Sequence, residues 1–158
     1  MKKTTKYLLI AGAVYLGVKA YGAFQAIKNL NFNVTGIRFR IIKSRLALGG
    51  TIFMDIVNPT QETITVDAIA GNVNTMDGTL IGDYKSNGKV VLKPGSNSIR
   101  FDWGTRTSLM LGAMVLEILK GKYPSIVLNT VVTYRGIPVS FPYKLNTKDY
   151  IPTLDLTA

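Results

Sequence analysis

Residues 46–59 read LALGGTIFMDIVNP, and their apolar side chains recur every second residue. The apolar residues of one parity are Leu46, Leu48, Ile52, Met54 and Ile56. Alternation of this kind places apolar side chains on one face of a sheet. The segment therefore predicts a long strand with one buried face. Gly49 and Gly50 indicate a bulge or a bend within it, and Asn58-Pro59 indicates its end.

The same period continues on both sides of this strand. Residues 37–41 alternate, residues 62–74 predict a further strand, and residues 99–103 alternate again. Asp77-Gly78 and Asn87-Gly88 are hairpin signals that enclose a strand over residues 79–85 and precede another over 89–92. Pro94-Gly95 marks one more turn.

The pattern changes over residues 108–120, where apolar residues recur at helical spacing. Thirteen residues of helix are too short to cross a bilayer, so we expect this helix to pack over the open end of a sandwich. Two alternating strands follow over residues 126–134 and 137–145, joined at Arg135-Gly136. Pro138 and Pro142 predict that the second is an edge strand, because proline cannot donate to a neighbour. Residues 146–158 have no clear period.

These strands, regular turns and single late helix are typical of an antiparallel β-sandwich. The motif Gly50-Thr51-Ile52-Phe53-Met54-Asp55-Ile56-Val57-Asn58-Pro59 resembles the strand of late embryogenesis abundant type 2 domains, also called water-stress and hypersensitive response domains. The similarity continues through Gly71-Asn72-Val73 to Lys93-Pro94-Gly95-Ser96 and covers roughly residues 30–145. It implies an immunoglobulin-like sandwich with a helix, often tethered behind one transmembrane segment, with a non-enzymatic protective or scaffold role. The strong positive charge of this chain departs from many members.

The N-terminal segment predicts a membrane anchor. Residues 7–27 contain only Lys19 and Gln25 as strongly polar residues, and as a helix they extend about 30 Å, the thickness of a bilayer core. The residues expected to face lipid are Tyr7, Leu8, Leu9, Ile10, Val14, Leu16, Val18, Phe24 and Ile27. Lys19 either extends its ammonium group to the interface or faces a protein partner or an anionic lipid. A cleavable signal peptide is the alternative, but Val18-Lys19-Ala20 is a poor cleavage site and the apolar run continues beyond it.

Small residues at a spacing of four allow a second helix to approach, and two such pairs occur: Ala13 with Gly17, and Gly22 with Ala26. They predict a possible homo-oligomer through the membrane helix.

The chain has a formal net charge of +10, which favours anionic neighbours. The residues expected to contact an anionic surface are Lys2, Lys3, Lys6, Lys28, Arg38, Arg40, Lys43 and Arg45. The alternative for the last four is a solvated strand face. Nucleic acid is disfavoured, because the aromatic residues have core parity and offer no stacking platform.

Cysteine and histidine are absent, which removes thiolate chemistry, the commonest metal ligand and the commonest general base. The nine carboxylates form no catalytic motif, so we expect no enzyme, no metal and no cofactor.

The sequence predicts three parts: a transmembrane helix with its basic flank (1–29), a type 2-like β-sandwich (30–146) and a tail (147–158). We expect a single-pass membrane protein of a cell envelope or a virion membrane, in contact with the bilayer and with other proteins of a larger assembly. Its function would be binding or assembly at the membrane surface. The alternatives are a minor structural protein of a membrane-containing virion or envelope complex, and a carrier of apolar ligands between the sheets.

Overall fold

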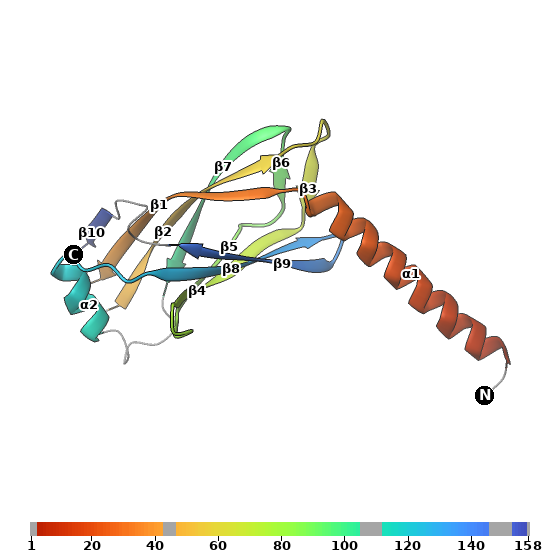
Figure 1. The fold of residues 1–158 in the computed structure, drawn as a ribbon, viewed down its shortest axis with the longest axis horizontal. Helices are drawn as coiled ribbons and strands as arrows, with labels where there is room; N and C mark the ends of the chain where they lie inside the picture. The colour runs from red at the N-terminus through yellow and green to blue at the C-terminus, as the bar shows by residue number, and fades with distance from the viewer. Residues whose placement is uncertain (1–2, 43–46, 105–111, 146–152, 158) are drawn as a thin grey trace.

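The computed structural model describes residues 3–42, 47–104, 112–145 and 153–157, and most of these residues lie in strands (Figure 1). Their elements are α1 (Lys3–Ile27), β1 (Asn31–Ile42), β2 (Ala47–Asn58), β3 (Ile64–Val66), β4 (Ala68–Thr75), β5 (Leu80–Lys85), β6 (Val90–Leu92), β7 (Gly95–Gly104), α2 (Gly112–Leu119), β8 (Ile126–Tyr134), β9 (Ile137–Leu145) and β10 (Thr153–Thr157). The prediction of a mainly β fold with one late helix is confirmed.

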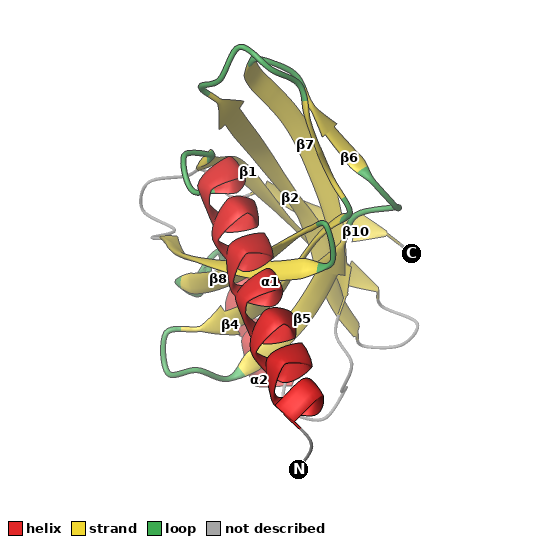
Figure 2. Ribbon diagram, turned by 90° about the vertical axis from the view of Figure 1, so that its right-hand side faces the viewer, coloured by secondary structure: helices red, strands yellow, loops and turns green. Residues whose placement is uncertain are grey.

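Within the described residues, ten strands form one eight-stranded sheet and one two-stranded sheet. The large sheet has the order β10-β1-β2-β7-β5-β4-β8-β9, and β3 pairs with β6 in the small one. β5 and β7 are joined through only two residue pairs, so the large sheet is nearly divided there into two halves. Phe32 of β1 and Phe141 of β9 nevertheless have ring centroids only 4.7 Å apart. The halves therefore face each other across a shared core, and the fold is sandwich-like (Figure 2).

Trp103 fills the seam where the two halves join. A Cβ on Gly50 of β2 would lie 2.7 Å from Trp103 Nε1, and one on Gly82 of β5 would lie 2.6 Å from Trp103 Cε3. Both distances are far shorter than van der Waals contact. The two glycines thus leave room for the indole ring, which is 4% exposed.

The bulge expected at Gly49 and Gly50 is absent. The pairing of β2 with β1 and with β7 runs through both glycines without a shift of register. The irregularity lies instead in β1, between Val34 and Gly36. A Cβ on Gly49 would lie 2.9 Å from the Trp103 carbonyl oxygen, and one on Gly50 would lie 2.7 Å from Trp103 Nε1, so both glycines serve close packing.

Two predicted strand assignments need correction. The strand expected over residues 62–74 is two strands, β3 and β4, which belong to different sheets and meet at Asp67. The Asn87-Gly88 turn exists, with Gly88 at φ +80°, but it does not close a hairpin: β5 pairs with β4 and β7, whereas β6 pairs with β3. A turn signal reports local backbone conformation and does not select the partner of the next strand.

One of the two edge strands of the large sheet was predicted from the sequence, and the other was not. β9 is an edge strand, as Pro138 and Pro142 predicted. The other edge is β10, a strand that was not expected from the sequence. β10 runs parallel to β1, with Arg38 opposite Thr153, and its five residues are too few to establish a period.

The tight turns follow their expected chemistry. Gly78 has φ +89°, and β4 and β5 form the predicted hairpin around Asp77-Gly78. Hydrogen bonds from Thr75 and from the backbone of Thr79 lower the pKa of Asp77. Arg135 and Gly136 have φ values of 50° and 76°, which are typical of a two-residue hairpin turn between β8 and β9.

The helices lie at opposite ends of the sandwich (Figure 1). Ile27, the last residue of α1, is fully buried in the core, and Leu30 joins it there. In α2, Val115 and Ile118 enter the same core, while Leu116 remains 57% exposed. α2 therefore closes one end, as expected, and α1 leaves from the other.

Candidate functional site

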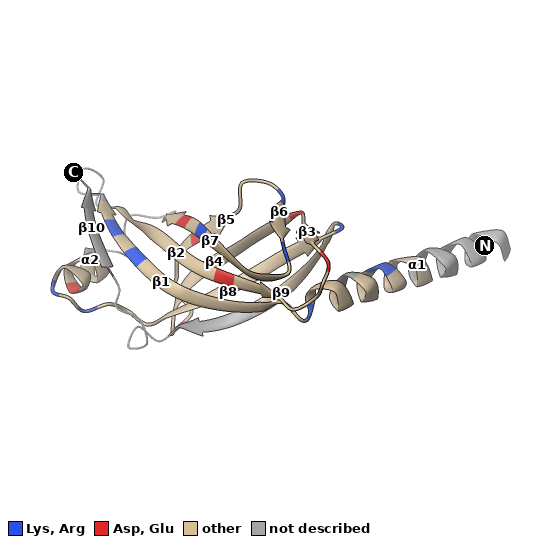
Figure 3. Ribbon diagram, turned by 90° about the horizontal axis from the view of Figure 1, so that it is seen from above, with Lys and Arg blue, Asp and Glu red and all other residues tan. Residues whose placement is uncertain are grey.

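α1 extends away from the domain (Figure 3), and its described side chains form an uncovered apolar surface. Every residue from 14 to 22 is exposed, so no side of the helix is covered over this stretch. The exposed fractions of Val14, Tyr15, Leu16 and Val18 lie between 59% and 68%. Large apolar side chains without cover on all sides of a helix are unusual in a folded domain and mark a surface that contacts something else.

The residues expected to face lipid do not share one environment. Tyr7, Leu8, Leu9 and Ile10 lie within α1, and Phe24 is 48% exposed. Ile27 differs, because its side chain is packed in the domain core and cannot contact a bilayer. No helix, among the residues that the structure describes, combines the length and the apolar character that a membrane crossing needs.

The small residues of the two predicted helix-packing pairs differ in whether the domain covers them. Gly17 and Gly22 face open space, with no atom within 4 Å of a Cβ built on either. Ala26 instead packs against the domain core, so it is not available to a second helix. Ala13 lies in α1. The packing of a second helix on Ala13 and Gly17 stays a prediction.

The expected basic surface separates into two regions. Lys28 is exposed directly after α1, and Lys3 and Lys6 lie within α1. Arg38 and Arg40 lie towards the opposite end of β1, about 25 Å from its first residue at the rise of a strand. The Arg38 guanidinium lies 5.7 Å from the Phe53 ring centroid. The two arginines are therefore poorly placed to contact the same headgroup layer as Lys28; Lys2, Lys43 and Arg45 lie outside the described residues.

A cation that was not among the residues predicted from the sequence lies beside α1. Arg135, in the β8–β9 turn, lines a hollow of about 480 Å³ together with Tyr15, Val18, Lys19 and Gly22. Its place in the sequence, 116 residues beyond Lys19, gives no local signal of this proximity. The turn signature at Arg135-Gly136 predicted the loop conformation but not what the loop approaches.

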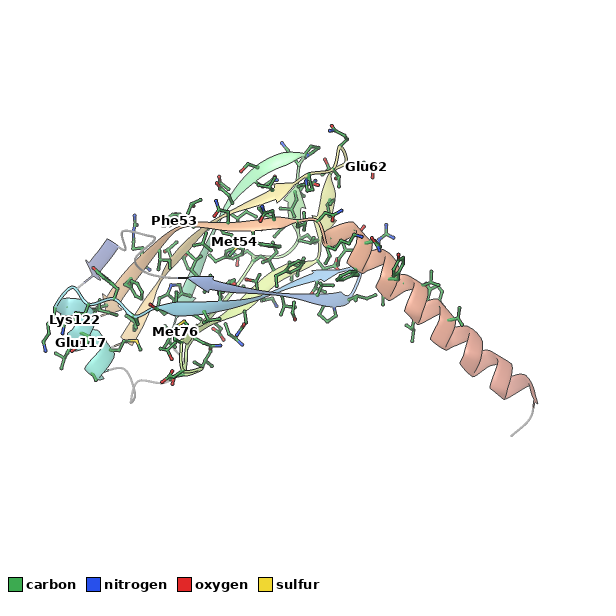
Figure 4. All side chains as sticks on the ribbon, viewed as in Figure 1. Phe53, Met54, Glu62, Met76, Glu117 and Lys122 are labelled. Carbon is green, nitrogen blue, oxygen red and sulfur yellow. The ribbon has the colours of Figure 1, made fainter. Side chains whose placement is uncertain are left out.

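Other hollows lie on the outer faces of the sandwich. One of about 560 Å³ is lined by side chains of β4, β5 and β8, including Asn72, Asp83 and Asn129. Another of about 450 Å³ lies beside Phe53, which is half-buried on the outer face of β2, while the next residue, Met54, is buried in the core (Figure 4). Within the described part of the chain, no three His, Cys, Asp or Glu side chains are grouped to hold a metal ion.

The comparisons with known proteins concern the fold. No protein-family model and no curated protein matches the chain. The structure is similar to a crystal structure of a protein from Archaeoglobus fulgidus, with 13% identity, a TM-score of 0.47, and 73% of this chain and 92% of that chain covered. It is also similar to the ligand binding region of serine-glutamate repeat protein A of Enterococcus faecium, with 14% identity, a TM-score of 0.40, and 82% and 98% covered. The solution structure of a putative late embryogenesis abundant protein has 13% identity, a TM-score of 0.46, and 89% and 84% covered.

Proposed function

We propose that this protein is a non-enzymatic, membrane-anchored module in which α1 enters the bilayer and the β-sandwich acts in binding or assembly at the membrane surface. We assign the sandwich to the immunoglobulin-like type of the late embryogenesis abundant type 2 domains, as the strand and turn motifs suggest. The observation that supports the anchor best is the uncovered apolar surface of α1 over residues 14–22.

The energetic argument for the anchor is the exposed apolar area. Removal of apolar surface from water contributes roughly 25 cal/mol per Å², so each large side chain transferred into lipid contributes about 1.5–3 kcal/mol. Val14, Leu16 and Val18 gain this energy only outside the domain, because the domain does not cover them. A membrane supplies such cover without a specific partner.

The domain itself supports a binding or scaffold role rather than a carrier role. Aromatic side chains of the two halves meet in the interior, as in Tyr84 and Phe101, whose ring centroids are 5.2 Å apart. An interior filled in this way favours a packed core over a cavity for apolar ligands. We therefore expect partners to contact the outer faces of the sheets.

Membrane extraction of the full chain tests the anchor. We expect the wild-type protein to stay in the membrane pellet after an alkaline carbonate wash and to need detergent for release. The double variant Val14→Asp/Leu16→Asp should be released by carbonate, because each aspartate inside the hydrocarbon costs about 2.5–3.5 kcal/mol. Leu80→Asp/Val91→Asp is the matched control, since these two exposed side chains lie on the domain, and it should remain in the pellet. Release of the wild-type chain without detergent would overturn the proposal.

A further inference from the structure

The hollow between α1 and the β8–β9 turn combines two cations with an apolar wall. Lys19 and Arg135 supply the positive charge, Tyr15 and Val18 supply exposed apolar surface, and none of the described residues that line the hollow is a carboxylate. Its volume of about 480 Å³ falls in the range of small-molecule sites in proteins. The two cations come from distant parts of the sequence, so the fold itself creates the site.

The β8–β9 turn holds Arg135 in place by contacts on both sides. The Gly136 backbone N–H donates to Asp67 Oδ2 at 2.8 Å, and the Asp67 N–H donates to the Thr133 carbonyl at 2.8 Å. The Arg135 guanidinium lies 5.2 Å from the Tyr134 ring centroid. These contacts fix the tip of the turn, so Arg135 meets α1 as part of an ordered surface.

A guanidinium and an ammonium group beside an apolar wall match the chemistry of a phospholipid. Arginine binds phosphate oxygens through two parallel hydrogen bonds, and lysine adds a compact positive charge. The wall formed by Val18 and Gly22 belongs to the helix that we place in lipid. We propose that this hollow binds the phosphate of an anionic lipid headgroup; this inference rests on the proposed function of α1 as an anchor.

Such a site also explains the lysine within the apolar segment. With a phosphate bound in the hollow, the headgroup layer lies beside Lys19, whose charge is then balanced where water is scarce. Residues 7–18 of α1 remain for the hydrocarbon, about 18 Å of helix, with Lys3 and Lys6 at the far interface; the stem of Lys19 and local thinning of the bilayer compensate for the shorter span. The domain would rest against the membrane through the β8–β9 turn.

Lipid retention by the full chain in a neutral detergent tests the site. Native mass spectrometry would compare retention of phosphatidylglycerol with that of phosphatidylcholine carrying the same acyl chains. We expect wild-type protein to favour phosphatidylglycerol by about tenfold or more. Lys19→Gln/Arg135→Asn should lose this preference; asparagine suits the left-handed backbone at position 135 and preserves the turn. The charge-conserving Lys19→Arg/Arg135→Lys variant should keep it.

The matched control is Lys120→Gln/Lys122→Gln, which removes the same charge at the other end of the domain (Figure 4). The Lys122 ammonium pairs with Glu117 at 3.8 Å and both side chains are exposed, so we expect this variant to keep both its stability and its lipid preference. The inference is overturned by an unchanged preference in Lys19→Gln/Arg135→Asn, by a loss in the control, or by displacement of the lipid with millimolar inorganic phosphate, which would indicate a free-phosphate site. The carbonate wash tests the membrane anchor separately. Absence of the lipid preference in the wild-type protein would therefore overturn the phosphate site without overturning the anchor.

Discussion

Tyr84 Oη of β5 and Thr130 Oγ1 of β8 lie 2.6 Å apart in the buried core, although β4 separates their strands. Gly71 of β4 is the register partner of both residues. A Cβ on Gly71 would overlap the Tyr84 phenol, so the hydroxyl reaches Thr130 only because a glycine stands between them. Three strands are thus joined by one side-chain hydrogen bond that crosses a glycine.

Gly71→Ala should destabilise the domain by about 2 kcal/mol, because an added methyl group in a filled site displaces the phenol and overpacks the core. Chemical denaturation of the full chain in detergent, followed through the fluorescence of Trp103, the single tryptophan of the chain, measures this change. Gly104→Ala is the control, since a Cβ there has no atom within 4 Å, and it should change the free energy of unfolding by less than about 0.5 kcal/mol. Equal stability of the two variants would contradict this account.

Tyr84 should also make the stability of the domain depend on alkaline pH. Burial raises the pKa of Tyr84 from 10.0 to about 12, with the hydrogen bond to Thr130 acting in the opposite direction. The folded state therefore keeps the proton longer than the unfolded state, and the resulting stability, about 2–3 kcal/mol, is present below pH 10 and is lost as the pH rises towards 12. Tyr84→Phe should remove the loss of folding stability that Tyr84 causes between pH 10 and 12. Tyr15→Phe, at an exposed tyrosine, should leave that loss unchanged. Unfolding curves of the three proteins between pH 9 and 12 provide the measurement.

The sequence predicted the strands better than their partners. Alternation in the segments 47–58 and 126–134 reports which face of a strand is buried, and the structure confirms it, because burial itself imposes the period of two. The same signal contains no information on the break at Asp67 or on the pairing of β6 with β3, because both depend on contacts between distant segments. The candidate site shows the same limit: Lys19 was identifiable as an unusual charge, but its proximity to Arg135 is created by tertiary structure alone.

Gly50→Ala should be more damaging than Gly71→Ala. A Cβ at Gly71 would lie 2.6 Å from the Asn129 carbonyl oxygen, whereas a Cβ at Gly50 would overlap the Arg38 carbonyl oxygen more severely and would also overlap the indole of Trp103. Backbone in the middle of a paired strand cannot move as a side chain does, so we expect a loss of more than about 3 kcal/mol or failure to fold. The same denaturation experiment applies, and a clear near-ultraviolet circular dichroism signal from Trp103 in a stable Gly50→Ala protein would contradict the prediction.

Asp67 should determine the order of the β8–β9 turn through a single hydrogen bond. Its carboxylate accepts from the Gly136 N–H, and no further hydrogen bond from the Gly136 N–H is present among the described residues. Asp67→Ala should cost about 1 kcal/mol and accelerate hydrogen exchange of the Gly136 amide, because the N–H is then left to water. Asp67→Asn keeps an acceptor oxygen at the same place, so it should preserve most of the protection while removing the charge.

The control for the variants Asp67→Ala and Asp67→Asn is Asp55→Ala. The Asp55 carboxylate also accepts one hydrogen bond, from Ser98 Oγ at 2.6 Å, but it lies on β2 rather than beside the turn. Its removal should leave exchange at Gly136 unchanged. If exchange at Gly136 were equally slow in Asp67→Ala and in the wild type, the turn would be ordered by its left-handed residues alone, and the position of Arg135 in the hollow beside α1 would not depend on Asp67.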